Sequence, residues 1–311
     1  MEYGRRREKM SKDMKIKRKN KIKHSIPSLI FDSMNYLFMI IFCVTCLYPF
    51  LFLVSMSLSA GTSNFASLRL IPEVIDFSAY RRVLSNEFMV SGFINTVIRV
   101  GIAVPLVMLA IVFTAYPLSK KYFPHRGFWT GFIVFTMFFS GGLIPSYLVI
   151  RGLGLLDSIW ALILPGLIPA YNMIIVRNYF MSLSPDLEES ARIDGANDFT
   201  ILIRIILPIS APIIATVSLW TAVGHWNAWF DSMIYIQKAS KQVLQVVLRR
   251  IVLEGTQEMM DLNTGMDDMA SISPDNIKAA TIMVATIPIL LVYPFVQKYF
   301  VKGIMVGSLK G

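Results

Sequence analysis

The 311-residue chain is poor in charge and in the residue types from which most active sites are built. Only 16% of its residues are charged, and it has three histidines and two cysteines, whereas 55% of its residues are hydrophobic. A soluble domain usually has about 25% charged residues and about 45–50% apolar ones. The shortage of charge therefore excludes an ordinary soluble domain. It predicts an all-α, polytopic membrane protein in which helix packs on helix in lipid.

Several sequence motifs of enzymes are also missing. The chain has no Gly-x-x-x-x-Gly-Lys-Ser/Thr phosphate loop, so we do not expect it to bind ATP in that way. It has no His-Glu-x-x-His, and its histidines (His24, His125 and His225) are far apart in sequence, which predicts no metal site. No pair of carboxylates inside an apolar run indicates a proton relay. We expect no catalytic residue, metal or cofactor on this chain.

The net charge of +10 is concentrated in a basic tail before the first apolar run, which we assign to residues 1–30. Its first 23 residues hold eleven Lys and Arg against three Asp and Glu, so the rest of the chain is nearly balanced. This distribution argues against a nucleic-acid partner for the chain as a whole. A basic tail of this kind indicates a cytoplasmic N-terminus, and it also suits an anionic lipid surface. A role in binding RNA or one specific lipid stays open. We expect residues 1–23 to be disordered.

Six apolar runs are long enough to cross a membrane, which takes about 20 residues. They cover residues 31–58, 93–118, 128–150, 159–180, 209–236 and 279–300. An even number of spans places both ends of the chain on one side. Lys and Arg are enriched in the connections on the side of the tail, so both termini are predicted to be cytoplasmic in a multi-pass cell-membrane protein. The long segments 61–91 and 237–278 are then external, either as plain loops or as a docking surface.

The connection between the fourth and fifth runs is polar and has the signals of a helix–turn–helix. Ser184 is a candidate N-cap, and Pro185 suits the first helical position. Acidic residues follow in the first turn, where the helix dipole favours them. Gly195 is expected to end the first helix in a left-handed conformation, and Asn197 or Asp198 to cap a second helix. A polar insert of this shape between two spans predicts a protein partner.

This connection, residues 184–208, resembles the EAA signature of ABC-importer permeases. The signature has Glu-Ala-Ala, a glycine after three more residues, and Ile-x-Leu-Pro after a further nine. The matching positions are Glu189, Ser190, Ala191, Gly195, Ile205, Leu207 and Pro208. Ser190 departs from the signature, by one small residue for another. Residues 115–120 and 220–230 also resemble maltose-type carbohydrate permeases, and residues 141–145, 152–157 and 297–303 resemble their complex-saccharide (lipoprotein and aldouronate-type) branch.

The resemblance implies an ABC type I importer permease fold with six spans over residues 31–311 and a coupling helix in 184–208. It implies a permease subunit of an ATP-driven importer for a carbohydrate, either an oligosaccharide or a uronate-containing saccharide. The implied partners are an ABC ATPase dimer, a second homologous permease, an extracytoplasmic solute-binding protein, membrane lipid and the saccharide. ATP and magnesium would bind to the ATPase chain, so this chain would not be an enzyme.

Two groups of residues follow as candidates. For coupling to the ATPase they are Glu188, Glu189, Ser190, Ala191, Arg192, Asp194, Gly195, Ile205, Leu207 and Pro208. Glu189 would contact the ATPase, Gly195 would supply the bend, and the Ile-x-Leu-Pro residues would anchor the second helix. For the solute path they are Trp226, Asn227, Trp229, Asp231 and Tyr235, which offer aromatic faces and hydrogen-bonding groups. Helix packing and an interfacial aromatic belt are the alternative for this second group.

Two ionisable residues inside the apolar runs, Arg99 and Asp231, are expected near span ends. They belong either to a functional site or, in the case of Arg99, to the membrane interface, where its side chain would reach toward the headgroups. Two other functions stay open. One is an ABC permease for an amino acid, a peptide or an anion. The other is a self-contained secondary transporter or membrane enzyme, which would show inverted repeats or buried ion ligands, and the sequence shows neither.

Overall fold

The computed structural model describes residues 26–59, 70–72, 74–254 and 272–308. Throughout these residues the chain is helical, and the pairing of extended segments is limited to an isolated bridge between Ser59 and Ile75. The all-α prediction is confirmed. Residues 1–25 of the basic tail and most of the acidic part of the 237–278 segment lie outside the described residues, whereas residues 26–30 belong to the first described helix. The chain divides into two units, 1–52 and 53–311, and the first of them contains most of α2 (Ile26–Ser57).

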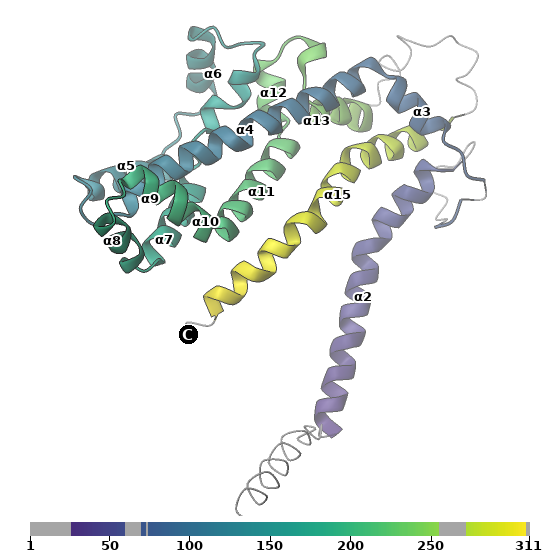
Figure 1. The fold of residues 1–311 in the computed structure, drawn as a ribbon. Coiled ribbons are helices and arrows are strands. Elements are labelled where there is room, and N and C mark those ends of the chain that lie inside the picture. Colours follow the sequence, from purple (N-terminus) through teal and green to yellow (C-terminus); the bar gives the residue numbers. More distant parts are fainter. Residues whose placement is uncertain (1–25, 60–69, 73, 255–271, 309–311) are drawn as a thin grey trace, which may run out of the picture. The chain divides into compact units, whose positions relative to one another are not determined.

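The second unit holds all the other helices (Figure 1). In chain order they are α3 (Ser78–Ser85), α4 (Glu87–Ser119), α5 (Arg126–Phe138), α6 (Leu143–Gly152), η1 (Ile159–Leu162), η2 (Leu164–Gly166), α7 (Ala170–Ser182), α8 (Asp186–Ile193), α9 (Asp198–Ile201), η3 (Leu202–Ile206), α10 (Leu207–Ile209), α11 (Ala211–Asn227), α12 (Phe230–Tyr235), η4 (Ala239–Lys241), α13 (Leu244–Arg249), η5 (Arg250–Glu254) and α15 (Pro274–Ser308). Of these, η1, η2 and η4 are 3-10 turns, and η3 and η5 are π turns.

Among the described helices, three are long and apolar enough to cross a membrane singly: α2, α4 and α15. Three further pairs pass the same test only as bent pairs. These are α5 with α6 at 112°, η1–η2 with α7 at 49°, and α9–α10 with α11 at 81°. If each bent pair is one span, the chain has the six spans that its hydropathy predicts.

The breaks lie where the backbone loses a hydrogen bond or takes an unusual conformation. Gly142, between α5 and α6, has φ +87°, and Pro169 precedes α7. The predicted fifth span is interrupted as well, because Ala228 and Trp229 separate α11 from α12. The second helical stretch of the 184–208 segment continues through Pro208 to Ile209, and the π turn η3 directly precedes α10. Proline has no N–H to give to an α-helical carbonyl, which explains irregular pairing at this point.

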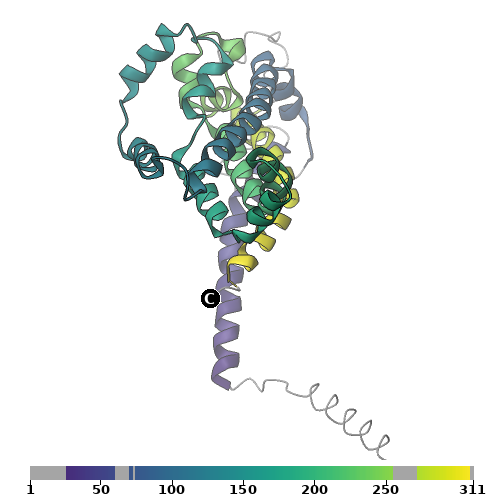
Figure 2. The same cartoon turned by 60° about the vertical axis from the view of Figure 1, so that its left-hand side comes forward.

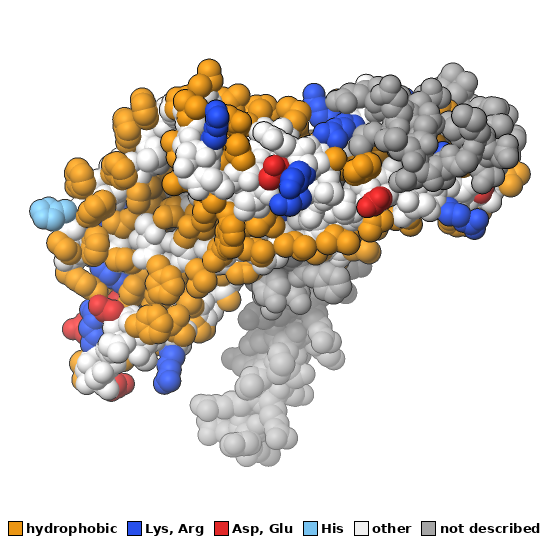
Figure 3. Space-filling model, turned by 90° about the horizontal axis from the view of Figure 1, so that it is seen from above, with side chains coloured by type: hydrophobic (Ala, Val, Ile, Leu, Met, Phe, Trp, Pro, Cys, Tyr) orange, Lys and Arg blue, Asp and Glu red, His pale blue; other side chains and the backbone are white. Residues whose placement is uncertain are grey.

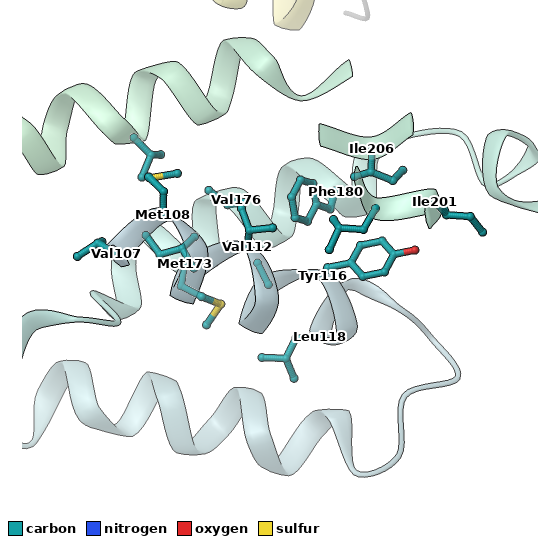
Figure 4. Packing of buried hydrophobic residues seen from close by; sticks show 14 of the residues in the cluster. Val107, Met108, Val112, Tyr116, Leu118, Met173, Val176, Phe180, Ile201 and Ile206 are labelled. Carbon is teal, nitrogen blue, oxygen red and sulfur yellow. The ribbon is translucent and has the colours of Figure 1, made fainter. Parts of the chain in front are cut away.

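The main core forms where α4 packs against α7 and α11 (Figures 1 and 2). The buried α4 positions recur every three or four residues, from Val107 to Leu118, as expected for one helix face. Figure 4 shows them interdigitating with side chains of α7, and Tyr116 meets Phe180 edge to face at 6.3 Å between ring centroids. Ile201 and Ile206 enter the same cluster from the 184–208 segment. This segment is therefore fixed to the core of the second unit.

A second cluster joins α3, α13 and α15 to the start of α4. Within the 61–91 segment the chain forms the short amphipathic helix α3, with Ala79 and Val83 buried and Leu84 exposed. Gly92 of α4 lies against the backbone of Leu244, so this helix pair comes close. The exterior is widely apolar: hydrophobic side chains cover much of the face in Figure 3, and charged side chains occur there in a few groups. Such an exterior suits lipid rather than water.

Candidate functional site

Helix α8 begins the candidate coupling segment and has two different faces. Glu188 and Ala191 are buried, whereas Glu189 and Ser190 are exposed. The predicted side-chain cap at its start is wrong. The Ser184 hydroxyl donates to the Asp186 carboxylate at 3.0 Å, and the first turn is closed by the backbone alone, where the carbonyl of Pro185 accepts from the N–H of Glu188.

The turn after α8 follows the sequence prediction closely. Gly195 has φ +83°, a conformation that side chains with a Cβ rarely adopt. The N–H of Ala196 donates to the carbonyl of Ala191 at 2.9 Å, which is the six-residue closure of a glycine-ended helix. Asn197, rather than Asp198, caps the next helix, because its Oδ1 accepts from the N–H of Thr200 at 2.8 Å.

A network of charges ties α8 to the end of α4. Glu188 pairs with Lys120, which caps the C-terminus of α4, and lies 3.8 Å from Arg192. One Arg192 nitrogen donates to both Asp198 (2.9 Å) and the Tyr122 hydroxyl (2.6 Å). Its hydrogen bond to Asp198 raises the pKa of Arg192, and burial together with the charge of Asp198 raises the pKa of Tyr122. Both shifts favour the protonated forms, which these two groups already have at neutral pH.

The remaining candidates for coupling divide by exposure. Those exposed are Glu189, Ser190, Arg192, Asp194, Gly195 and Pro208; Ile205 and Leu207 are half-buried. The surface of α8 also presents Leu187 (41% exposed) and Ile193 (82% exposed), neither of which the signature contains. The signal that could have found them is helical spacing, because Leu187, Ser190 and Ile193 recur every three residues on one side of α8. Lys120 was missed because its link to α8 spans 68 positions of sequence.

The five candidates for the solute path do not gather around one cavity. The Trp226 indole donates to the carbonyl of Ala285 at 3.2 Å and lines a cavity of about 380 Å³ whose other walls are apolar side chains of α4, α11 and α15. Trp229 lies under the guanidinium of Arg249 at 4.2 Å, and Tyr235 is buried. Asn227 is the last residue of α11. Helix packing thus accounts for much of this aromatic group.

Asp231, the fifth candidate, pairs instead with Arg99. The expectation that Arg99 reaches toward headgroups is wrong, because its side chain is 2% exposed inside the second unit. Its Nε donates to Nδ1 of His225 at 3.2 Å, and Nη1 donates to Asp231 Oδ1 at 3.2 Å and to the carbonyl of Ala228 at 3.4 Å. Nη2 donates to Asp231 Oδ2 and to the carbonyl of Leu162 at 3.2 Å. A buried guanidinium needs such complete pairing, and here it also satisfies carbonyls at two breaks between helices.

A cavity of about 550 Å³ lies beside this cluster, near the start of α4. Its walls are Asn95, Ile98, Leu156, Asp157, Ser158, Ile159, Leu162, Ile236, Lys241 and Val243. The Asp157 carboxylate accepts from the N–H groups of Gln237 (2.7 Å) and Lys238 (2.9 Å), and these hydrogen bonds hold its pKa below the usual value. Lys241 donates to the backbone carbonyl of Asp157 at 2.9 Å. Hydrogen bonds between separate segments of the chain therefore hold the rim of this cavity together.

Residues 77–306 match the family model described as "Binding-protein-dependent transport system inner membrane component". The chain belongs to this family. As a member it is a permease subunit of the inner membrane, and the ABC type I permease fold predicted for it is confirmed.

Two relatives are similar to this permease in sequence, and one solved structure is similar to it in fold as well. It is 42% identical to the "Polygalacturonan/rhamnogalacturonan transport system permease protein YtcP" of Bacillus subtilis (strain 168), over 91% of this chain and 99% of that protein. It is 40% identical to "Protein LplC" of the same organism, over 91% of this chain and 95% of that one. It resembles, with TM-score 0.81 and 36% identity over 89% of this chain and 99% of the other, a chain of a bacterial ABC transporter involved in the import of the acidic polysaccharide alginate.

Proposed function

We propose that this permease forms half of the translocation path of an ATP-driven ABC importer for a carbohydrate, and that residues 184–208 are its coupling element. The observation that carries the proposal is the two-sided α8 within an EAA-type spacing. One face is held to the permease through Glu188 and Ala191, and the other presents Glu189, Ser190 and Ile193. A helix that is fixed on one side and exposes both charge and a large apolar side chain on the other suits a groove on a partner protein.

The partner that fits this face is a separate ABC ATPase, which would carry ATP and magnesium. Glu189 would make charge-assisted contacts there, Ile193 would fill an apolar pocket, and Gly195 would hold the bend. The Ile-x-Leu-Pro residues connect the element to α11. Closure of an ATPase dimer would displace α8 and move the spans between inward-open and outward-open states.

We propose a uronate-containing oligosaccharide as the solute. Relatives of the permease are named for polygalacturonan and rhamnogalacturonan, and a structural relative for alginate. The path would run along the break between α11 and α12, where Trp226, Asn227, Trp229 and Asp231 lie, with Tyr235 buried behind it. A second homologous permease and an extracytoplasmic solute-binding protein would complete the complex.

The proposed topology places both termini and the 184–208 segment in the cytoplasm, with the basic tail 1–30 ahead of a permease domain at 31–311. The distribution of Lys and Arg supports this orientation. It follows that the cavity near the start of α4 opens on the external side.

Reconstitution with the ATPase, the second permease and the solute-binding protein tests the coupling element. Gly195→Val and Glu189→Lys should abolish saccharide uptake and its stimulation of ATP hydrolysis, while both variants still insert into the membrane. Ser182→Ala, an exposed change at the end of α7, is the matched control and should transport normally. Full uptake by both variants would refute the coupling role, and uptake of amino acids or peptides in place of saccharides would refute the proposed solute class.

A further inference from the structure

The two adjacent glutamates of α8 lie in different surroundings. The Glu188 side chain is 11% exposed and its partner Lys120 is 10% exposed, whereas Glu189 is exposed. Lys120 also lies over the Tyr116 ring, at 4.3 Å from its centroid. Glu188 therefore points into the permease and is unavailable to a partner protein, although the sequence grouped it with the residues that contact the ATPase.

The pair is well placed with respect to both helices. Lys120 is the C-cap of α4, where a cation is favoured, and Glu188 lies in the first turn of α8, where an anion is favoured. A charge pair with so little exposure depends on its geometry, because either partner alone would be left with an uncompensated, nearly buried charge. The apolar contacts of Ala191 have no such directional requirement. The ion pair is thus the least exposed directional contact that holds α8 against α4, and the more exposed Arg192 supplements it through Tyr122.

Helix α4 is suited to receive a displacement from α8. It is a single helix of 33 residues, and it packs against α7 and α11. Arg177 of α7 donates to the carbonyl of Leu118 at 2.9 Å, so the last turn of α4 is also held from this side. The same helix carries Asn95 and Arg99, which bind the segments around the second cavity.

We propose that Lys120 and Glu188 are positioning residues that form a joint, through which α8 passes its displacement to α4. The inference rests on the proposed function of α8 as the coupling helix. It assigns different roles to the paired glutamates. Glu189 contacts the ATPase, and Glu188 connects α8 to α4, the helix that packs against α11 of the proposed solute path.

The test uses Lys120→Met, Glu188→Gln and the double variant in the complete reconstituted complex. Each single variant should co-purify with the ATPase within about twofold of wild type, while saccharide transported per ATP hydrolysed falls by roughly tenfold, within the usual range of coupling effects. The double variant should be no worse than the worse single variant, because both changes remove one contact. The ratio of transport to hydrolysis is the readout that a merely structural role would leave unchanged in correctly folded protein.

Three results would overturn the joint. These are wild-type transport per ATP in both single variants, loss of ATPase association by Glu188→Gln, and additive losses in the double variant. Thermal unfolding of each complex in detergent identifies a misfolded variant, and Glu188→Asp then replaces Glu188→Gln, with a smaller loss of coupling expected from the shortened side chain. If the wild-type chain does not associate with an ABC ATPase at all, the proposed function fails, and that result is distinct from the three above.

Discussion

At the scale of single residues, Arg99 shows what the membrane interior demands of a charge. Five N–H groups of a guanidinium need acceptors, and the chain supplies a carboxylate, an imidazole nitrogen and two backbone carbonyls. The carbonyls come from Leu162 and Ala228, which lie at breaks of two different spans. A break leaves carbonyls without helical partners, so the arginine and the breaks satisfy one another.

Arg99→Lys should therefore be far from conservative. Lysine keeps the charge but has three donors without a planar fork, so it leaves acceptors in this cluster unsatisfied. Asp231→Asn should also be severe, since it leaves the arginine charge uncompensated. We expect each variant to lower the free energy of unfolding by about 3–5 kcal/mol, measured by denaturation in detergent.

The control for this pair is Arg151→Lys, because Arg151 is exposed at the end of α6. It should leave the free energy of unfolding within about 0.5 kcal/mol of wild type. The double change Arg99→Met with Asp231→Leu should be less destabilising than Asp231→Asn alone. Equal tolerance of Arg99→Lys and Arg151→Lys would contradict the buried cluster.

Asp157 gives a prediction of pH dependence. Backbone N–H groups of Lys238 and Gln237 stabilise its charged form, so its folded pKa lies below the ordinary value of 3.8. A lowered pKa in the folded state adds stability above the unfolded pKa, and this stability is lost as the pH falls through the folded pKa. The carboxylate should therefore stabilise the permease fully at neutral pH, and this stabilisation should be lost in acid as the pH falls from the unfolded pKa through the folded pKa.

Asp157→Asn isolates the charge, because asparagine tolerates the φ of +57° at this position and still offers an acceptor oxygen. Wild type should unfold at a higher temperature than the variant at pH 7. The difference should begin to shrink as the pH reaches the unfolded value of 3.8, and it should vanish below the folded pKa. A difference that stayed constant from pH 7 to pH 3 would show that charge is not the cause.

At the scale of helices, the turn chemistry was readable and the long-range pairing was not. Gly195 and Asn197 act on neighbours within a few residues, so local rules predicted the bend and one of its two caps. The start of α8 differs from the prediction because the Ser184 hydroxyl donates to the Asp186 carboxylate and does not cap the helix. The breaks inside spans lie at proline, which removes a backbone hydrogen bond, and at glycine, which takes an unusual backbone conformation. Hydropathy averages over such positions and therefore predicted continuous runs.

Contact between α4 and α13 leads to a prediction for two glycines of one helix. A Cβ on Gly92 would lie 3.2 Å from the Cα and N of Leu244, so the two backbones would have to separate. Gly101 has no atom within 4 Å of such a Cβ. Gly92→Ala should destabilise the permease by about 1–3 kcal/mol, while Gly101→Ala should be neutral or stabilise it by less than about 1 kcal/mol.

Both substitutions add one methyl group to α4, so a common effect on helix propensity cancels between them. Unfolding in detergent measures the difference. Separation of α13 would also weaken the hydrogen bond from the N–H of Leu244 to Thr96 Oγ1, now 2.9 Å, and faster amide exchange at Leu244 in Gly92→Ala alone would show it. Equal stability of the two variants would contradict the close approach.

At the scale of the whole permease, the fold class and the helix–turn–helix of residues 184–208 could be predicted, because hydropathy and local turn signals are properties of contiguous sequence. The Lys120–Glu188 pair and the Arg99 cluster could not, since their partners lie 63–132 positions apart. The solute-path assignment stays a prediction. It took its residues from one run of sequence, whereas the structure distributes them among packing, cation–π and ion-pair contacts.

Helix α4 links the two ends of the second unit, which leads to a last prediction. Lys120 holds α8 at one end of α4. At the other end, the Asn95 amide donates to the carbonyls of Ser240 (2.9 Å) and Gln242 (3.0 Å). Asn95 and Lys120 are about 37 Å apart along the helix, at 1.5 Å rise per residue.

Sites so far apart normally contribute additively to a property, within about 0.3–0.5 kcal/mol. If α4 moves as one body, Asn95→Ala and Lys120→Met interrupt the same transmission, and their effects on transport per ATP should not add. The double variant should then match the worse single variant in this ratio, while thermal unfolding shows additive losses of stability. Additive losses in both measurements would mean that the two ends act separately and that another span carries the displacement.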